Sequence, residues 1–406
     1  MFKITSDNII FILSIILCSF FIIFESRNGT IPVIIITLLI LLVHLKKENW
    51  RYKIYYTTFH SLVFIFSFYC MLTSIWAYDN ISSFKAGMAI VKILFIISVL
   101  YNYYIKKNSI KELLNCIIWA GTIITFYSFY YYGINKVFKY LVTNERLENG
   151  YANVNSIGMF LAFTILVSFF QFVYIYKKII FSNIFNIFSF LLIITTGSRK
   201  AFAILLIGIF LITLSKYLKK NIVLNILKII IIVVFTVTIL KIILSLQIFN
   251  GINERMEGLI ALLTKKGKID HSTFLRQEYI KLGIKIFKEN FLFGIGMDNT
   301  YLTTYVIENK KAYLHNNYVE ILAGGGIIGF SLFYGIYIYL ILKFYQYRKI
   351  WDIYSKFCII LLLLLLLIHY GSVEYYYKST YFYLMIFFLE INKLRKKKHI
   401  RRKSSA

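Results

Sequence analysis

Long runs of apolar residues alternate with short polar segments along almost the whole chain. A run must be about 20 residues long to cross the roughly 30 Å hydrocarbon core of a bilayer as a helix. Runs of about this length fall near 8–24, 31–45, 57–77, 85–105, 113–133, 155–176, 179–196, 199–217, 222–249, 319–344, 354–370 and 379–392. Those near 31–45 and 379–392 are short, so the count of twelve is open by one or two. The pattern predicts an all-α polytopic membrane protein with a single transmembrane domain over 1–406.

Two polar segments are longer than connectors need to be, one at 134–154 and one at 250–318. Long ordered loops tend to carry function. Within the larger loop, Phe274–Asn290 places apolar residues on one stripe and lysines on another, which predicts a helix on the membrane surface. The apolar stripe holds Leu275, Tyr279, Leu282 and Ile286, and the other holds Lys281, Lys285 and Lys288. Gly294 and Gly296 then predict a turn.

Composition and charge agree with this picture. The chain is 59% hydrophobic with a mean hydropathy of +0.71, which is typical of membrane proteins. A net charge of +28 raises the question of nucleic acid, but the lysines and arginines lie mainly in short stretches between apolar runs. With the N-terminus inside, every basic loop and the basic tail 393–406 are cytoplasmic, and 134–154 and 250–318 lie outside. We therefore expect a multi-pass protein of the bacterial cytoplasmic (inner) membrane with both termini cytoplasmic, and no nucleic-acid partner.

Several kinds of chemistry lack their usual sequence signals. The four cysteines lie inside apolar runs without CxxC spacing, so neither a zinc site nor a disulfide framework is indicated. No DxD, HExxH, GxSxG or Walker sequence occurs. Metal-dependent sugar-nucleotide transfer, zinc proteolysis, serine hydrolysis and ATP-driven transport are therefore disfavoured, and we expect neither a cofactor nor a metal. The triple glycine Gly324–Gly326 lies in a predicted span and favours close helix approach over ligand binding.

Polar residues gather on the predicted outer side, where charges at a membrane edge are costly. They lie in "TGSRKAF" (196–202), "STFLRQEY" (272–279) and "LHNNYVE" (314–320). Arg199 and Lys200 begin a predicted helix that Ser198 can cap, so two cations and exposed N–H groups converge in a phosphate-binding geometry. The alternative is an interfacial pair that anchors a helix end. Positive charge on the outer side opposes the topology rule and favours function.

The large outer loop adds two arginines and a histidine. Arg276 and Arg255 could grip phosphate oxygens with bidentate guanidinium groups, although a solvated loop cation is the simpler interpretation of each alone. His315 stands just before a helix that enters the membrane. A neutral imidazole there could accept a proton from a sugar hydroxyl. The simpler interpretation is a polar residue at a membrane boundary.

Three segments together resemble a known family. "TGSRKAFAILLIGIFLI", "RQEYIKLGIKIFKENFLFGIGMDN" and "HNNYVEILAGGGIIGF" are similar, in order and spacing, to the shared core of the O-antigen ligase and polysaccharide polymerase family. The resemblance covers about 190–335, and "RLENGYANVNSIGMFLAF" (146–163) resembles the family's segment before a central span. The other predicted helices agree only in number and topology.

The resemblance implies a metal-independent enzyme similar to inverting, multi-spanning glycosyltransferases of the GT-C type, with an undecaprenyl-diphosphate-linked glycan as donor. Arg199 and Arg276 correspond to the family's essential arginines, and His315 corresponds to its essential histidine. Arg255, Arg146 and Lys200 are added as diphosphate-binding residues on charge and location alone. Lys200 stands where family members often have glycine, which leaves open how this helix start presents its N–H groups.

The leading functional hypothesis is a polymerase that transfers lipid-linked glycan onto a lipid-linked repeat unit on the outer face, for O-antigen, capsule or exopolysaccharide. The alternative is a ligase that moves the finished glycan to lipid A core or another acceptor. A transporter or flippase of lipid-linked sugars is a second alternative, but transporters usually show repeat symmetry and matching broken helices, which the sequence lacks. Expected partners are the lipid-linked oligosaccharide, membrane lipids, and a chain-length regulator and flippase of the same pathway.

Overall fold

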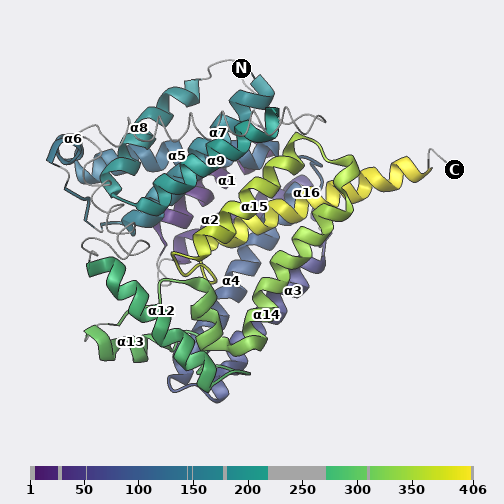
Figure 1. Cartoon of the computed structure of the whole chain (residues 1–406). Helices are drawn as coiled ribbons and strands as arrows, with labels where there is room; N and C mark the ends of the chain where they lie inside the picture. Colours follow the sequence, from purple (N-terminus) through teal and green to yellow (C-terminus); the bar gives the residue numbers. More distant parts are fainter. Residues whose placement is uncertain are drawn as a thin grey trace. The chain divides into compact units, whose positions relative to one another are not determined.

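The computed structural model describes residues 5–25, 30–51, 53–143, 145–148, 150–176, 181–217, 271–308 and 311–403, and these residues form helices joined by turns, without a strand (Figure 1). Helices satisfy every backbone polar group within one segment, as a bilayer requires. The predicted span near 222–249 and the candidate residue Arg255 lie outside the described residues.

Eight of the described helices are long and apolar enough to cross a membrane. They are α1 (Ser6–Ile23), α2 (Thr30–Lys47), α3 with its 3₁₀ extension (Thr58–Ile75), α4 (Asn80–Tyr104), α5 (Lys111–Tyr132), α7 with its π-helical extension (Val154–Tyr176), α9 (Arg199–Tyr217) and α14 (Asn317–Gln346). Each coincides with a predicted span. The chain is therefore an all-helical, multi-pass membrane protein.

The other predicted spans have different outcomes. The span near 179–196 falls on α8 (Phe181–Thr196), and the span near 354–370 falls on α15 (Ile353–His369). Both contain apolar helices shorter than a full span. The span near 379–392 lies inside the longer helix α16 (Lys378–Lys403), whose second half is basic. The count of twelve therefore stays a prediction.

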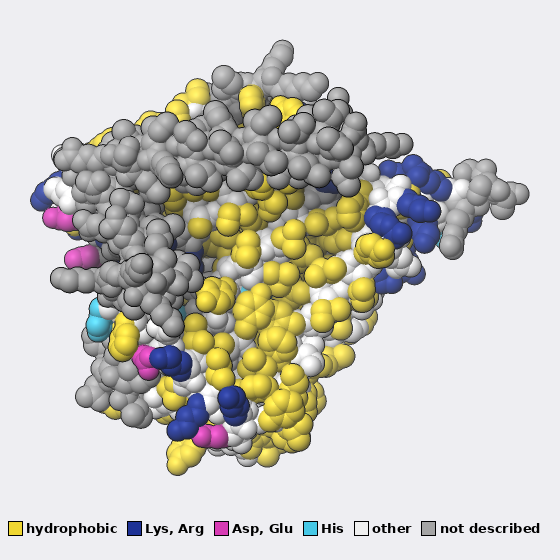
Figure 2. Space-filling model, in the orientation of Figure 1, with side chains coloured by type: hydrophobic (Ala, Val, Ile, Leu, Met, Phe, Trp, Pro, Cys, Tyr) yellow, Lys and Arg dark blue, Asp and Glu magenta, His cyan; other side chains and the backbone are white. Residues whose placement is uncertain are grey.

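The chain divides into two compact units, with boundaries inside α1 and α2. The first unit comprises Met1–Ile10, Val33–Ile110 and His271–Ala406. In it α3 packs against α4 and α14, and α16 packs against α4 and α15. Large buried aromatic side chains fill the space between these helices, including Phe59, Phe66, Phe333, Tyr337 and Tyr375. Hydrophobic side chains cover the exposed surface of α14 and α3, and lysines and arginines gather towards the end of α16 (Figure 2).

The second unit comprises Phe11–Pro32 and Lys111–Asp270, and its described helices surround α7. Helices α5, α8 and α9 all pack against α7. Gly121 permits the close approach of α5, since a Cβ there would lie 2.3 Å from side-chain atoms of Thr164. Small residues at crossings are the usual means of packing helices in a membrane. Hydrogen bonds between helices add to this packing, as between the Thr125 and Ser189 hydroxyls at 2.8 Å.

Helix α14 is broken at Gly326, whose φ of 61° and ψ of −166° are not helical. The turn at Gly294 and Gly296, both with positive φ, lies against this break. The Ile295 N–H donates to Ala323 O at 3.0 Å, and the Ile327 N–H donates to Phe291 O at 2.9 Å. The predicted turn is confirmed. Gly324–Gly326 do permit a close approach, but the backbone that packs against them is the loop at 291–297, whereas the predicted partner was a helix.

Candidate active site

Three segments of the first unit surround the predicted histidine: α12 (His271–Glu289), α13 (Thr300–Glu308) and the start of α14. The apolar stripe of α12 packs against α14. Its residues Tyr279 and Ile286 are buried with Leu314, Val319 and Ala323. The helix predicted over Phe274–Asn290 is confirmed. Its apolar stripe packs against protein, and its predicted place on the membrane surface stays a prediction. The lysines of its other stripe are exposed.

His315 lies between two aromatic rings. Its ring centroid is 6.2 Å from that of Tyr279, with the planes 11° apart, and 4.3 Å from that of Tyr313, with the planes 44° apart. The side chain is half-buried, and the backbone has a φ of 55°. A histidine in this left-handed region is uncommon and costs free energy, so the surrounding contacts have to hold it there. Aromatic packing on both sides restricts the directions in which the imidazole can point.

Glu320 supplies one of those contacts, and sequence analysis did not single it out. Its buried carboxylate accepts hydrogen bonds from the Thr300 hydroxyl and, at 2.8 Å, from the Leu314 N–H. Because Leu314 precedes His315, the carboxylate ties the histidine's own backbone to α13 and α14. A signal was present in the sequence: Glu320 is the acidic residue in the first turn of a long apolar helix, where charge is costly.

The two asparagines after His315 hold the N-terminus of α14 in place. The Asn316 carboxamide oxygen caps α14 by accepting from the Val319 N–H at 3.1 Å. Asn317 is fully buried, accepts from the Glu374 N–H at 2.8 Å, and donates to the Tyr334 hydroxyl at 3.0 Å. These bonds are structural, because they join the α14 start to the turn before α16. Both asparagine side chains are therefore used in hydrogen bonds that hold the fold, whereas the His315 side chain is positioned by contacts with aromatic rings.

Arg276 lies on the same helix as Tyr279, one turn earlier. Residues three apart are neighbours on a helix surface, so the half-buried Arg276 is next to the ring that stacks on His315. The structure therefore brings two of the predicted site residues, Arg276 and His315, to one region of the first unit. Tyr279 packs against His315, a role that its place in an apolar stripe did not reveal.

A polar cluster docks the segment after α12 onto the start of α4. The buried Asn299 carboxamide accepts from the Asp79 N–H at 2.7 Å and donates to Ser83 Oγ at 2.8 Å. The Tyr301 hydroxyl donates to the Asp79 carboxylate. This hydrogen bond, and then the Ser82 N–H, lower the pKa of Asp79, whereas the carboxylate raises the pKa of Tyr301 to about 12. The cluster holds α13 in place and was not predicted from the sequence.

Arg199 and Lys200 begin α9 in the second unit. Ser198 caps this helix, since its Oγ accepts from the Ala201 N–H at 3.4 Å, as predicted. Gly197, with a φ of 58°, makes the turn between α8 and α9. Both basic side chains are half-buried at the helix N-terminus, where backbone N–H groups and the helix dipole favour anions.

Arg146 has structural partners within the same unit. Its Nε donates to Thr196 O at 2.8 Å, and an Nη donates to Asn155 Oδ1 at 3.0 Å. The guanidinium therefore fixes the end of α8, three residues before Arg199. This explains its place beside the helix start, whereas its predicted contact with phosphate stays a prediction.

The predicted residues fall into two groups, each described within its own unit. Arg199, Lys200 and Arg146 belong to the second unit, and Arg276 and His315 to the first. Within the described ranges, no three histidine, cysteine, aspartate or glutamate side chains are grouped as metal ligands. The chemistry that the described groups can supply is proton acceptance by an imidazole and charge stabilisation by guanidinium groups and helix N–H groups.

Comparison with known proteins identifies this region. Residues 184–334 match the family model of the O-antigen ligase. The matched residues run from α8 into α14 and include Arg199, Arg276 and His315. No curated protein matches the chain. The match confirms the resemblance over this part of the chain, and it supports a membrane protein of polysaccharide or lipopolysaccharide biogenesis, either an O-antigen ligase or a related polymerase.

Proposed function

We propose that this protein is a polysaccharide polymerase. It transfers a glycan from undecaprenyl diphosphate onto a lipid-linked repeat unit at the outer face of the cytoplasmic membrane. The observation that carries the proposal is the position of His315 in the matched region, with its ring between those of Tyr279 and Tyr313. Arg276 lies on α12, one turn before Tyr279. A half-buried imidazole in the same region as a guanidinium suits a proton acceptor near a binding site for anions.

In the proposed reaction, the acceptor hydroxyl attacks the anomeric carbon from the face opposite the diphosphate. The new glycosidic C–O bond forms while the C–O bond to the diphosphate breaks, so the anomeric centre inverts. His315 takes the hydroxyl proton, and undecaprenyl diphosphate leaves with the electron pair of the broken bond. Arg276 stabilises the negative charge that develops on the leaving group, and the same role for Arg199 rests on the resemblance to the family alone. Guanidinium groups then do the work for which other glycosyltransferases use a metal ion.

A ligase reaction is the second candidate, because the matching family model carries that description. The chemistry at the anomeric carbon is the same, and only the acceptor differs. The break in α14 is a feature that transporters also have, but its backbone groups are occupied, which disfavours a transporter. Broken helices in transporters leave backbone groups for the substrate, whereas here the Ile327 and Ile328 N–H groups donate to Phe291 O and Leu292 O.

The test is to incubate the purified protein with a lipid-linked repeat unit and to separate the products on a gel. A ladder of products identifies a polymerase. A product that forms only when a different acceptor is added identifies a ligase. If the wild-type protein yields no more product than a protein-free control under both conditions, the proposed enzymatic function is wrong.

A further inference from the structure

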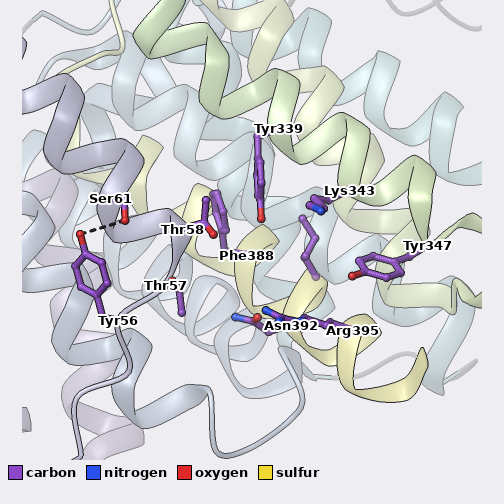
Figure 3. Close-up of a pocket in the computed structure, with 11 residues that line it drawn as sticks. Tyr56, Thr57, Thr58, Ser61, Tyr339, Lys343, Tyr347, Phe388, Asn392 and Arg395 are labelled. Carbon is purple, nitrogen blue, oxygen red and sulfur yellow. Dashed lines mark hydrogen bonds between the residues drawn. The ribbon is translucent and has the colours of Figure 1, made fainter. Parts of the chain in front are cut away.

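A polar cavity lies in the first unit, and none of the candidate active-site residues lines it. Its volume is about 730 Å³, and it forms between the segment that leads into α3, the second half of α14 and the second half of α16 (Figure 3). The aromatic pair Tyr339 and Phe388, stacked at 5.6 Å, forms part of its wall. Lys343 from α14 and Arg395 from α16 supply positive charge.

The two cations lack carboxylate partners among the described residues. The Lys343 ammonium donates to the neutral carboxamide of Gln346 at 3.1 Å, and the exposed Arg395 guanidinium has no hydrogen bond or ion pair with any described group. Among the described residues that line the cavity, none is an aspartate or a glutamate. The carboxylates nearby in α16 and before α15, Glu390 and Asp352, both pair with Lys393, at 2.7 and 2.8 Å.

Further groups suit an anion with oxygen acceptors. The Asn392 carboxamide, which also donates to the Tyr101 hydroxyl, lines the cavity beside the two cations. The centroid of the Tyr339 ring lies 5.6 Å from the Lys343 ammonium, and the Tyr339 hydroxyl is directed towards the same space (Figure 3). Lys398 lies over the ring of Tyr347, another wall residue, at 5.5 Å from its centroid. An arginine and a lysine on facing helices can hold a phosphate, the first by bidentate hydrogen bonds and the second as a point charge.

The cavity also stands where an apolar surface meets a basic one. Ile338 and Leu342, one turn and one residue before Lys343, are 57% and 60% exposed on α14. Figure 2 shows the hydrophobic face of α14 and α3 ending near the lysines and arginines of α16. This is the arrangement that an anionic phospholipid fits, with acyl chains on the apolar face and the headgroup phosphate at the cations. Basic pockets between transmembrane helices bind such headgroups in other membrane proteins.

We propose that this cavity is a binding site for a phosphate group, and that the phosphate belongs to the headgroup of an anionic membrane lipid. The site is separate from the proposed transfer reaction and needs no glycan substrate. A free phosphate compound would use the same two cations, so the experiment has one arm for each source.

The full-length protein, purified in detergent, is analysed by native mass spectrometry with added phosphatidylglycerol or phosphatidylcholine. A second arm titrates pyrophosphate without lipid. The tested variant is Lys343→Gln with Arg395→Gln. The matched control is Arg348→Gln with Lys349→Gln, which removes the same charge from exposed residues of the adjacent turn that do not line the cavity.

The wild type and the control should retain phosphatidylglycerol in preference to phosphatidylcholine, and the cavity variant should bind it at least about tenfold more weakly. Pyrophosphate binding that only the cavity variant loses, without a preference for phosphatidylglycerol, would keep the phosphate site and assign it to a soluble ligand. Equal losses in both variants, or no binding in either arm, would overturn the proposal. Unfolding midpoints show whether the variants are folded, and Arg395→Gln alone serves if the double variant is not.

Discussion

At the scale of single residues, His315 is held more firmly than a loop histidine needs to be. Its backbone has a positive, left-handed φ, a conformation that residues with a Cβ usually avoid. Contacts on both sides hold this conformation. The preceding residue, Leu314, is buried and its N–H donates to the Glu320 carboxylate, and the following residue, Asn316, caps α14. Positioning of this kind is what a group that acts in a transition state requires.

Replacement of His315 by alanine should abolish most glycan transfer. A lost general base costs about 10²–10⁴-fold in rate, while Arg276 still binds the donor diphosphate in the proposed mechanism, so donor binding should be nearly unchanged. The measurements are the rate of product formation and the affinity for lipid-linked donor, with His271→Ala, an exposed histidine of the same unit, as control. Residual activity should rise with pH as the acceptor hydroxyl ionises. Normal turnover with lost donor binding would make His315 a binding residue.

Replacement of Arg276 by lysine tests the geometry of the proposed diphosphate site separately from its charge. Lysine keeps the positive charge but loses the planar pair of donors, so transfer should fall by about 10²-fold, as when one preorganised donor is removed from an active site. Lys285→Gln, an exposed cation of the same helix, should be nearly neutral. Product formation by Arg276→Ala at close to the wild-type rate, in a folded protein, would remove Arg276 from the mechanism.

At the scale of elements, the break in α14 fixes the loop that follows α12. A Cβ at Gly326 would lie 2.3 Å from Leu292 O, and its φ of 61° already disfavours a side chain. Gly326→Ala should therefore lower the free energy of unfolding by about 2 kcal/mol or more. Gly335 is a matched control on the same helix, because a Cβ there meets nothing within 4 Å. Thermal unfolding in detergent measures both, and an equal effect of the two substitutions would contradict a special role for the break.

The docking of α13 onto the start of α4 should depend on pH. Because Tyr301 and the Ser82 N–H lower the folded-state pKa of Asp79, this carboxylate contributes stability above its unfolded pKa and loses it as the pH falls through the lower folded value. Tyr301→Phe should cost about 1 kcal/mol at pH 7. The difference from wild type should shrink in acid, when Asp79 is protonated in both proteins. Unfolding midpoints between pH 7 and pH 3 measure it, and a difference independent of pH would assign the loss to packing.

At the scale of the whole molecule, sequence patterns predict the helices well because hydropathy and length largely determine which segments can cross a bilayer. The helix of Phe274–Asn290, the cap at Ser198 and the turn at Gly294 are local features, and they were predictable for that reason. The roles of Tyr279 and the Asp79 cluster were not, because they depend on contacts between segments far apart in the chain. The charge of Glu320 in an apolar helix was a signal, but its hydrogen-bond partners were not predictable. The phosphate cavity has the same origin, since three separate helical segments form its wall.

The orientation in the membrane is the last prediction, and every assignment to the outer face depends on it. Basic residues end α2, α9 and α14 and fill the second half of α16, which the positive-inside rule places in the cytoplasm. A cysteine at Ser272, exposed at the start of α12, should then react with an impermeant maleimide in intact spheroplasts, whereas one at Lys403 should react only after permeabilisation. The native cysteines Cys18, Cys70, Cys116 and Cys358 are buried, so they should give little background. Labelling of both positions from the same side, or of Lys403→Cys alone in intact spheroplasts, would reverse the topology and remove His315 and Arg276 from the face where a lipid-linked glycan is presented.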